Sequence, residues 1–311
     1  SGNVWQQGHS AFCDGLVLPK HNATLRQSQI EPTLFIAHCG AGILAILVWV
    51  DDLWIAFSAM ALYEEFVSLY AARFPSKHNL GCTKFAGICI DYKRGQSMTI
   101  HQRPHIELAY NKFVTDKVAA AKSPAVTSPA VADRNSPRHY SKLHLAANDD
   151  ERQMMKGRPY LAALATLMYK VHFTSAHLNY HTSFLGQFMH DPSPPCWDAV
   201  IDLIIYDYHN RFIDIIVYGG EPSIPKSIPT RRHADFLKSL GFHCYSDASW
   251  LLRSPAGYFI FMCNGPVDWA AKLIRVICHS SAEAEIAAGC MMGKRIVYIT
   301  GFLSEFNIKL T

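Results

Sequence analysis

The amino-acid sequence predicts a multidomain protein of mixed helix and sheet, α+β or α/β. The chain has 311 residues and is 50% hydrophobic, which is enough to bury one large core or two medium ones. Short apolar runs typical of strands alternate with segments of helical periodicity. Stretches rich in proline separate these segments. Charged residues make up only 17% of the chain, so most of it should fold.

The first clear element is a β-hairpin that carries two acids. Residues 1–40 show no regular pattern and are expected to be irregular. The apolar run Ile43–Val50 then predicts a buried strand, and Leu53–Phe57 predicts its partner. Asp51 and Asp52 separate the two runs, and they lack the Asn-Gly or Asp-Gly chemistry that is usual at such a turn. The presence of two acids at this turn therefore needs another explanation.

The middle of the chain predicts helices, short strands and two linkers. Residues 59–74 have helical spacing, with Glu64 and Glu65 on the solvent side. Proline, serine and charge then mark two linkers. The further expected elements are strands at 85–91 and 97–101, a helix at 104–113, a linker at 114–158, a helical block at 159–189, a helix at 197–208, a strand at 213–218 and a second linker at 221–230.

The last segment predicts three strands followed by a long helix. The strands are expected at 242–247, 257–263 and 267–271, and the helix at 280–306. Ser280 or Ser281 is a suitable N-cap, and Glu283 lies in the first turn, where an acid is favourable.

Composition narrows the class of protein. The net charge of +4 permits a nucleic-acid partner without arguing for one. Nine Cys, an odd number with no CxxC pair, indicate reduced thiols in an intracellular protein rather than disulfides or a zinc site. Residues 1–20 lack the pattern of a signal peptide, and the longest apolar run, 41–50, has about half the length of a membrane span. Because the chain begins with Ser1, we expect a fragment or a processed product.

The adjacent acids Asp51 and Asp52 predict a metal site. Two carboxylates about 4 Å apart repel by roughly 4 kcal/mol at an effective dielectric constant of about 20. A divalent cation removes this repulsion, and Mg²⁺ prefers carboxylate oxygens together with substrate phosphates. Two such metals would suit phosphoryl transfer. The alternative is a solvated turn that happens to contain two acids.

Asp247 and Glu283 form a second candidate pair. Asp247 ends a predicted strand and Glu283 opens a predicted helix, so together they could hold Mg²⁺. The alternative is a strand-end acid and a helix-capping Glu. His172, His177 and His181 are a weaker candidate, and a partly buried polar face explains them better than a ligand set. The sequence contains no G-x-S-x-G, P-loop or H-E-x-x-H motif.

Several segments resemble, in order, those of copia-type retrotransposon reverse transcriptases. Val48–Leu53 is similar to the (Y/W)-V-D-D motif of that family. The other matching blocks are Gln27–Phe35 (Q-S-x-x-D-P-x-L-F), Leu80 and Gly81 with Phe85–Ile88 (L-G … F-L-G-I), Ile100–Ile106 (I-x-x-S-Q-x-x-Y-I), Leu164–Tyr169 (V-G-S-L-M-Y), Tyr245–Trp250 (Y-S-D-A-D-W), Arg253–Phe259 (R-S-T-S-G-Y-x-F), Trp269–Lys272 (W-x-S-K) and Ser280–Glu285 (S-S-x-E-A-E). Each block alone is weak, but their order and spacing are specific.

The resemblance implies a fold, an activity and a set of site residues. It implies a reverse-transcriptase palm at 1–113, a linker with a thumb or connection region at 114–235, and an incomplete ribonuclease H-like domain at 236–311. Asp51 and Asp52 match two of the three polymerase carboxylates, and Asp247 and Glu283 match the first two ribonuclease H acids. The implied cofactor is Mg²⁺, with Mn²⁺ as a substitute.

The implied partners are an RNA template, a DNA primer, an RNA–DNA hybrid and dNTPs, with no membrane and no expectation for the oligomeric state. The implied location is intracellular, in cytoplasmic virus-like particles, in the nucleus or in both. Each set of acids lacks at least one carboxylate within residues 1–311, and the family's T-R-P-D is replaced by Thr174–His177. We therefore expect an enzyme fragment that is inactive as an isolated chain. The alternatives are a decayed or co-opted nucleic-acid-binding remnant and, ranked last, a small metal-dependent hydrolase.

Overall fold

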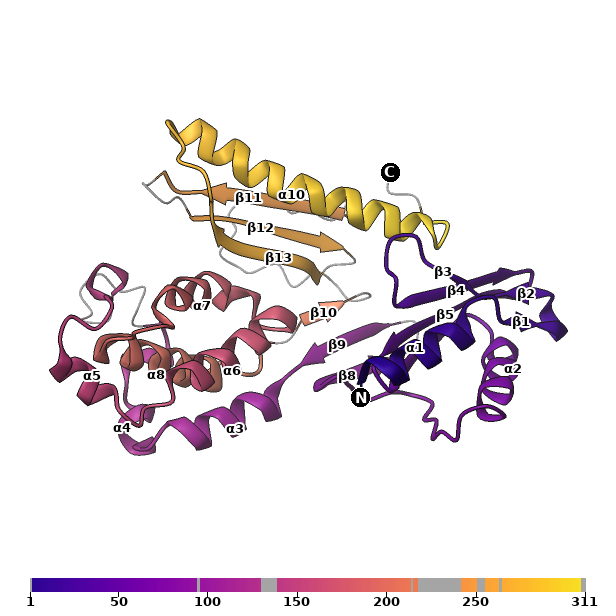
Figure 1. Ribbon diagram of the computed structural model, residues 1–311, viewed down its shortest axis with the longest axis horizontal. Coiled ribbons are helices and arrows are strands. Elements are labelled where there is room, and N and C mark those ends of the chain that lie inside the picture. The colour runs from indigo at the N-terminus through magenta and orange to yellow at the C-terminus, as the bar shows by residue number, and fades with distance from the viewer. Residues whose placement is uncertain are drawn as a thin grey trace. The chain divides into compact units, whose positions relative to one another are not determined.

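The computed structural model confirms a mixed fold of helices and antiparallel sheets (Figure 1). It describes residues 2–93, 96–129, 139–213, 215–217, 242–250, 255–262 and 265–308. All strand pairs within these ranges are antiparallel, which places the fold in the α+β class. The chain forms two compact units, Ser1–Gly81 with Gly293–Thr311 and Cys82–Met292. The predicted linker 221–230 lies outside the described residues.

The first unit is built on a four-stranded sheet in the order β3-β4-β5-β6. Two helices pack on one face of this sheet. The core between them and the sheet contains Leu44, Ile46 and Val48. This core explains why the strand at 43–50 was readable from sequence. The elements are α1 (Gly2–Cys13), β3 (Arg26–Gln27), β4 (Leu34–Cys39), β5 (Gly42–Trp49), β6 (Asp52–Phe57) and α2 (Met60–Ala71), with a small ribbon of β1 (Val17–Leu18) and β2 (Ala23–Thr24) and a 3₁₀ turn at Pro19–His21.

The expectation that residues 1–40 are irregular is wrong. This range holds α1 and four strands. The sequence hides α1 because it carries no acid in its first turn and no basic residue in its last, so the usual terminal signals are missing. It is held by packing instead, since Cys13 is fully buried beside Phe66 and Tyr70 of α2.

The helical spacing predicted that Glu65 lies on the solvent side of α2, and this prediction is also wrong. The Glu65 side chain is only 5% exposed. One carboxylate oxygen accepts a hydrogen bond from the Lys20 backbone N–H (2.7 Å), and the other accepts one from His21 Nδ1 (2.5 Å). Burial alone would raise the pKa of Glu65, but these hydrogen bonds outweigh it and lower the pKa. These hydrogen bonds from Lys20 and His21, the latter 44 residues away in the sequence, compensate the cost of burying the Glu65 carboxylate.

The opposite face of the same sheet is covered by the end of the last helix. Leu34, Ile36 and Ala45 are buried there, and Phe302 and Phe306 pack against them. The helix is α10 (Ser281–Ser304), whose C-terminal part belongs to this unit. The middle of the sheet is therefore buried on both faces, which accounts for the nearly continuous apolar run of β5.

The second unit contains a helical region that interrupts a sheet. The sheet has the order β10-β9-β8-β7, so its neighbouring strands β9 and β10 lie far apart in the sequence. These strands are β7 (Lys84–Phe85), β8 (Ile88–Lys93), β9 (Ser97–His101) and β10 (Ile215–Val217). The helices between them are α3 (Arg103–Phe113), α4 (Lys117–Ala121), α5 (Asp149–Met155), α6 (Tyr160–Phe173), α7 (Asn179–Leu185) and α8 (Pro194–His209).

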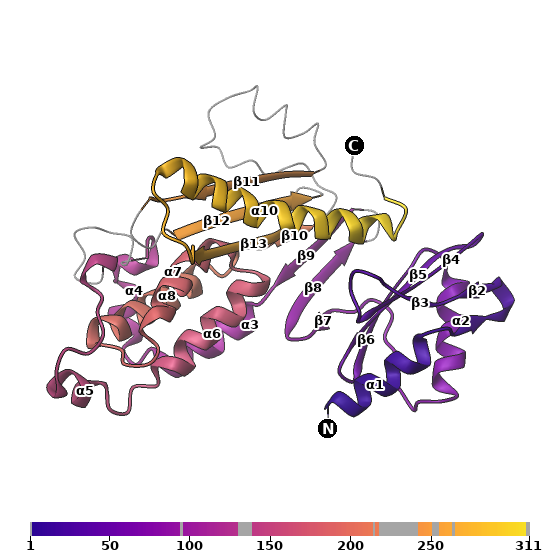
Figure 2. The ribbon, with the colours of Figure 1, turned by 45° about the horizontal axis from the view of Figure 1, so that its top comes forward.

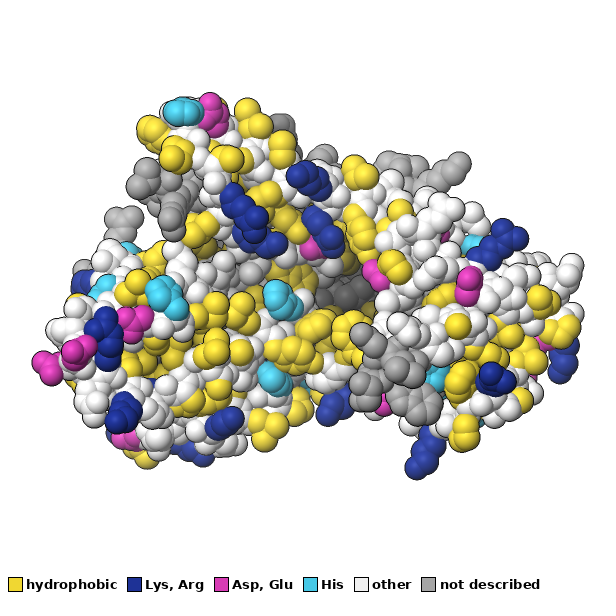
Figure 3. All heavy atoms as spheres, in the orientation of Figure 1, with side chains coloured by type: hydrophobic (Ala, Val, Ile, Leu, Met, Phe, Trp, Pro, Cys, Tyr) yellow, Lys and Arg dark blue, Asp and Glu magenta, His cyan; other side chains and the backbone are white. Residues whose placement is uncertain are grey.

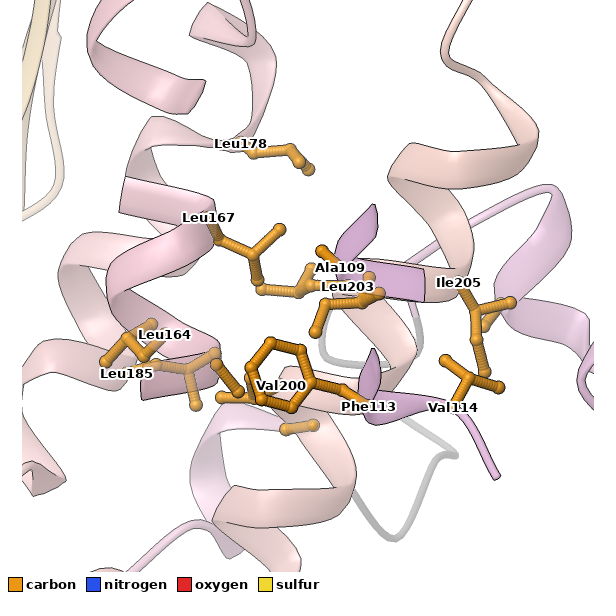
Figure 4. Packing of buried hydrophobic residues seen from close by; sticks show 14 of the residues in the cluster. Ala109, Phe113, Val114, Leu164, Leu167, Leu178, Leu185, Val200, Leu203 and Ile205 are labelled. Carbon is orange, nitrogen blue, oxygen red and sulfur yellow. The ribbon is translucent and has the colours of Figure 1, made fainter. Parts of the chain in front are cut away.

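These helices share one core, and Figure 4 shows the side chains of α3, α6 and α8 converging on it. Leu164, Leu167 and Leu203 are almost fully buried. The segment 114–158 is not simply a linker, because it contains α4 and α5 and adds Ala120 and Leu143 to this core. Its helices are too short to show a convincing period in the sequence.

The three predicted C-terminal strands are confirmed as β11 (Phe242–Ala248), β12 (Pro255–Met262) and β13 (Gly265–Leu273), paired in that order. Figure 2 shows α10 following them as one long helix. By length and composition alone α10 could also cross a membrane, a property that it shares with core helices of soluble proteins. Figure 3 shows hydrophobic side chains at the surface along its course, and Ile286 and Val297 are 66% and 73% exposed.

Candidate active site

The acid pair of the first unit lies at a tight hairpin between β5 and β6. Trp49 pairs with Asp52, which leaves Val50 and Asp51 as the two-residue loop. The φ angle of Val50 is +57°, in the left-handed region. A two-residue hairpin needs such an angle, and glycine normally supplies it. For a β-branched residue it is strained by about 1–3 kcal/mol, and strain of this kind concentrates at functional sites.

The sheet register determines where each acid lies. Asp52 is the first residue of β6 and shares a face of the sheet with its partner Trp49, whereas Leu53 and Val48 share the other face. Asp51 stays in the loop, and both acids are exposed. His9 of α1 lies close enough to Asp51 for its charge to be felt: burial lowers the pKa of His9, and the charge of Asp51 partly opposes this shift.

The two carboxylates fit a Mg²⁺ site that is completed by a substrate. They are adjacent and exposed, and the only ligand atoms that they offer are oxygens. Within the described ranges no group of three or more His, Cys, Asp or Glu side chains could hold a metal ion. Mg²⁺ commonly binds one or two carboxylates and takes its other ligands from water and phosphate oxygens. Asp51 and Asp52 could supply that partial set.

The second pair, Asp247 and Glu283, occupies the predicted elements of the second unit. Asp247 is exposed on β11, opposite Gly257 of β12. Glu283 is in the first turn of α10, where its carboxylate accepts a hydrogen bond from the His279 N–H (2.5 Å). The Ser280 hydroxyl accepts one from the Glu283 N–H (3.2 Å), so Ser280 is the N-cap. This is the reciprocal arrangement of a capping box, displaced by one residue.

Glu283 therefore already has a structural role, whereas no comparable contact of Asp247 is seen within the described part of the chain. The capping geometry matches the structural alternative that the sequence left open for Glu283. It does not remove the carboxylate from solvent, since Glu283 is exposed. The two acids belong to the same unit, but they are not part of a three-ligand cluster among the described residues.

The His cluster is a packed polar face. His177 lies in the 3₁₀ turn Ala176–Leu178 rather than on one helix with His181. His177 packs edge-on against Tyr206, and His181 is hydrogen-bonded to the Tyr140 hydroxyl. Burial lowers the pKa of both rings, that of His181 to about 4. Neutral imidazoles with aromatic neighbours suit a structural role.

Sequence reasoning missed a buried ion pair between α6 and α8. Lys170 Nζ lies 2.8 Å from Asp207 Oδ1 and 2.5 Å from Ser175 Oγ. Both charged side chains are almost fully buried. The sequence did contain one sign of this pair: Lys170 falls on the same face of α6 as the buried Leu167 and Val171. A charge on an apolar face predicts a buried partner.

Comparisons with known proteins agree with the resemblance seen in the motifs. The chain is 27% identical over 292 residues, 90% of its length, to the Retrovirus-related Pol polyprotein from transposon RE2 of Arabidopsis thaliana. It is 21% identical over 264 residues, 85% of its length, to the Retrovirus-related Pol polyprotein from transposon TNT 1-94 of Nicotiana tabacum. It spans only 17% and 18% of these two relatives.

A shorter relative shares about half of the chain. The Secreted RxLR effector protein 161 of Plasmopara viticola is 30% identical over 151 residues, which are 47% of this chain and 94% of that protein. No protein-family model and no solved structure matches the chain. About half of this chain is therefore similar to nearly the whole of a shorter protein.

Proposed function

The chain belongs to the Pol polyproteins of copia-type retrotransposons, and on this premise we propose that it is part of a reverse transcriptase and ribonuclease H. The observation that carries the proposal is the hairpin in which a strained Val50 presents Asp51 and Asp52. In this proposal the four-stranded sheet of the first unit is the polymerase palm. The helical region is the thumb or connection, and β11–β13 with the start of α10 are a ribonuclease H-like domain.

Each part of the chain would have a limited task in the reaction. Asp51 and Asp52 would hold Mg²⁺, which supplies charge stabilisation and activation of the attacking oxygen when it is bound. Because Asp51 and Asp52 are exposed, their carboxylates are accessible to the phosphates of a dNTP. Asp247 and Glu283 would hold Mg²⁺ against the RNA strand of a hybrid. The remaining carboxylates of both sets would have to come from outside residues 1–311.

Activity assays on two protein lengths test this proposal. The chain of residues 1–311 should neither extend a DNA primer on an RNA template nor cleave the RNA of a hybrid. A protein extended in both directions to the length of its polyprotein relatives should do both in the presence of Mg²⁺. Failure of the extended protein in both assays would reject the proposal.

The second candidate function is nucleic-acid binding without catalysis. It is favoured by the capping role of Glu283, which already gives that carboxylate a structural partner. This function predicts hybrid binding with a steep dependence on salt concentration. It also predicts no Mg²⁺-dependent turnover at either protein length, which separates it from the first proposal.

A further inference from the structure

The C-terminal part of α10 makes a specific contact with the outer face of the β3–β6 sheet. Phe302 and Phe306 pack against the buried Leu34, Ile36 and Ala45. Gly301 fits closely against Ile30, because a Cβ atom at residue 301 would lie only 3.0 Å from Ile30 Cδ1. The small residue therefore lets the helix approach the loop that precedes β4.

Polar contacts fix the helix in one position on this face. One oxygen of the Glu305 carboxylate lies 2.5 Å from Ser28 Oγ, and the other accepts from the Gln29 N–H at 2.7 Å. His38 Nε2 lies 2.7 Å from the Glu305 carbonyl oxygen. The Tyr298 hydroxyl donates to the Glu31 carboxylate at 3.0 Å.

Tyr298 lies about one helical turn before Phe302 and Glu305 about one turn after it, so the polar contacts hold the helix at two points along its length. Charge-assisted hydrogen bonds of this kind are stronger than neutral ones.

The covered face is also the face to which Asp52 belongs. Asp52 pairs with Trp49, and Trp49 is two residues from Leu47 on the same side of β5. Leu47 packs into the cluster that contains Phe302 and Phe306. Two residues of strand span about 7 Å, which is the length of only about two base pairs at roughly 3.4 Å each. A duplex that reached Asp52 across this face would therefore extend over Leu47 and meet α10.

We propose that Gly293–Phe306 forms an intramolecular cover that competes with a nucleic-acid duplex for the sheet face beside Asp52. The inference rests on the proposed function, since it takes the duplex as the ligand of Asp51 and Asp52. Binding would require the end of α10 to leave the sheet. If the face were covered nine-tenths of the time, the apparent Kd for a duplex would be raised about tenfold.

The first test removes the apolar contact. The chain with Phe302→Ala and Phe306→Ala should bind a fluorescent RNA–DNA hybrid about tenfold more tightly than the unaltered chain in Mg²⁺. Val297→Ala is the matched control, because it shortens a side chain of the same helix that is 73% exposed. The control should bind the hybrid with unaltered affinity. Hydrogen exchange of residues 34–37 reports whether the face has been opened.

The second test closes the cover covalently and does not depend on the stability of the first variant. A Cβ atom at residue 301 would lie 3.4 Å from Ile30 Cγ1, close to the place of a cysteine sulfur at residue 30. The double variant Ile30→Cys and Gly301→Cys should therefore form a disulfide on oxidation. The oxidised protein should bind the hybrid at least about tenfold more weakly than the same protein after reduction.

The outcomes separate the cover from the proposed function. Equal hybrid affinity of the oxidised and reduced proteins would overturn the cover and make this part of α10 a permanent part of the fold. The proposed function would survive that result if Asp51→Asn with Asp52→Asn abolished the Mg²⁺ dependence of binding. A chain that binds no hybrid in any form, with its face opened as judged by hydrogen exchange, would overturn both.

Discussion

Two groups of charges in this chain differ in where their countercharges lie. Lys170 and Asp207 are buried and neutralise each other across 2.8 Å. Asp51 and Asp52 are exposed, adjacent and like-charged, on a turn whose Val50 adopts a strained angle. The charges of the first arrangement are balanced within the fold, whereas the like charges of the second would be balanced by a divalent cation. The two groups therefore differ in that one is a charge pair balanced within the fold and the other a pair of like charges that, in our proposal, a cation balances.

Glu283 lies between these two extremes. It is exposed like Asp51, but its carboxylate already accepts a hydrogen bond at the start of α10. Substitution of these charged residues distinguishes the two groups.

The largest expected effect concerns the hairpin acids. In the extended protein, Asp51→Asn with Asp52→Asn should slow primer extension by on the order of a thousandfold or more, about 4 kcal/mol in activation free energy. Asp247→Asn is the matched control and should leave extension unchanged while it abolishes hybrid cleavage. Similar losses of extension in both variants would contradict the division of the chain into two sites.

The buried ion pair should dominate the stability of the second unit. Lys170→Met leaves Asp207 buried without its partner and should lower the free energy of unfolding by about 3–5 kcal/mol. Arg152→Met is the control, because Arg152 is about half exposed and each of its ion pairs, with Asp149 and Asp191, should contribute less than about 1 kcal/mol. Urea denaturation measures both. Equal effects would show that burial does not distinguish the two pairs.

Stability should also fall in acid because of His181. The pKa of His181 is about 4 in the folded chain, below its usual value near 6.5. The unfolded chain therefore binds more protons between these values, and folding loses up to about 3 kcal/mol as the pH falls from about 6.5 to 4. His177 acts in the same direction. The variant His181→Gln should show a flatter dependence, and an unchanged slope in urea titrations would contradict the assignment.

Glu283 should contribute to stability through the helix cap. Glu283→Ala should lower the free energy of unfolding by about 1 kcal/mol in the absence of Mg²⁺. Glu285→Ala, an exposed acid of the same helix, should change it by less than about 0.5 kcal/mol. A loss that appears only in Mg²⁺ would assign the Glu283 carboxylate to metal binding.

The smallest effect, and one of opposite sign, is expected at the hairpin turn. Val50→Gly should stabilise the chain by about 1 kcal/mol, because relief of the left-handed strain exceeds the added entropy of the unfolded state. Asn22 has a φ angle of +46°, and asparagine tolerates this region, so Asn22→Gly should change stability little. Thermal unfolding in the absence of Mg²⁺ measures both. Destabilisation by Val50→Gly would show that the valine is not strained.

The sequence revealed those features that depend on neighbours along the chain. The hairpin of Asp51 and Asp52, the strand of Asp247 and the start of α10 at Ser280 follow from local apolar runs and capping residues, and the structure has them. It did not reveal the burial of Glu65, whose partner His21 is 44 residues away. It likewise missed the Lys170–Asp207 pair, since pairing across such separations leaves no local period.

The segment 114–158 illustrates a different limit. Its proline and serine suggested a linker, yet Ala120 and Leu143 contribute to the helical core. Such short elements are stable only through the core that they join, which a local pattern cannot anticipate.

The position of β10 beside β9 has a consequence for how the second unit is assembled. Ile215 pairs with Ile100, so the chain leaves the sheet after β9, forms the helical region and returns to the same edge. The entry and exit of that region are held within one strand spacing, about 4.8 Å. The region is therefore topologically an insertion, which could lengthen or shorten without shifting the register of β7–β9. Because closing so long a loop is entropically unfavourable, β10 should be the last strand of its sheet to form.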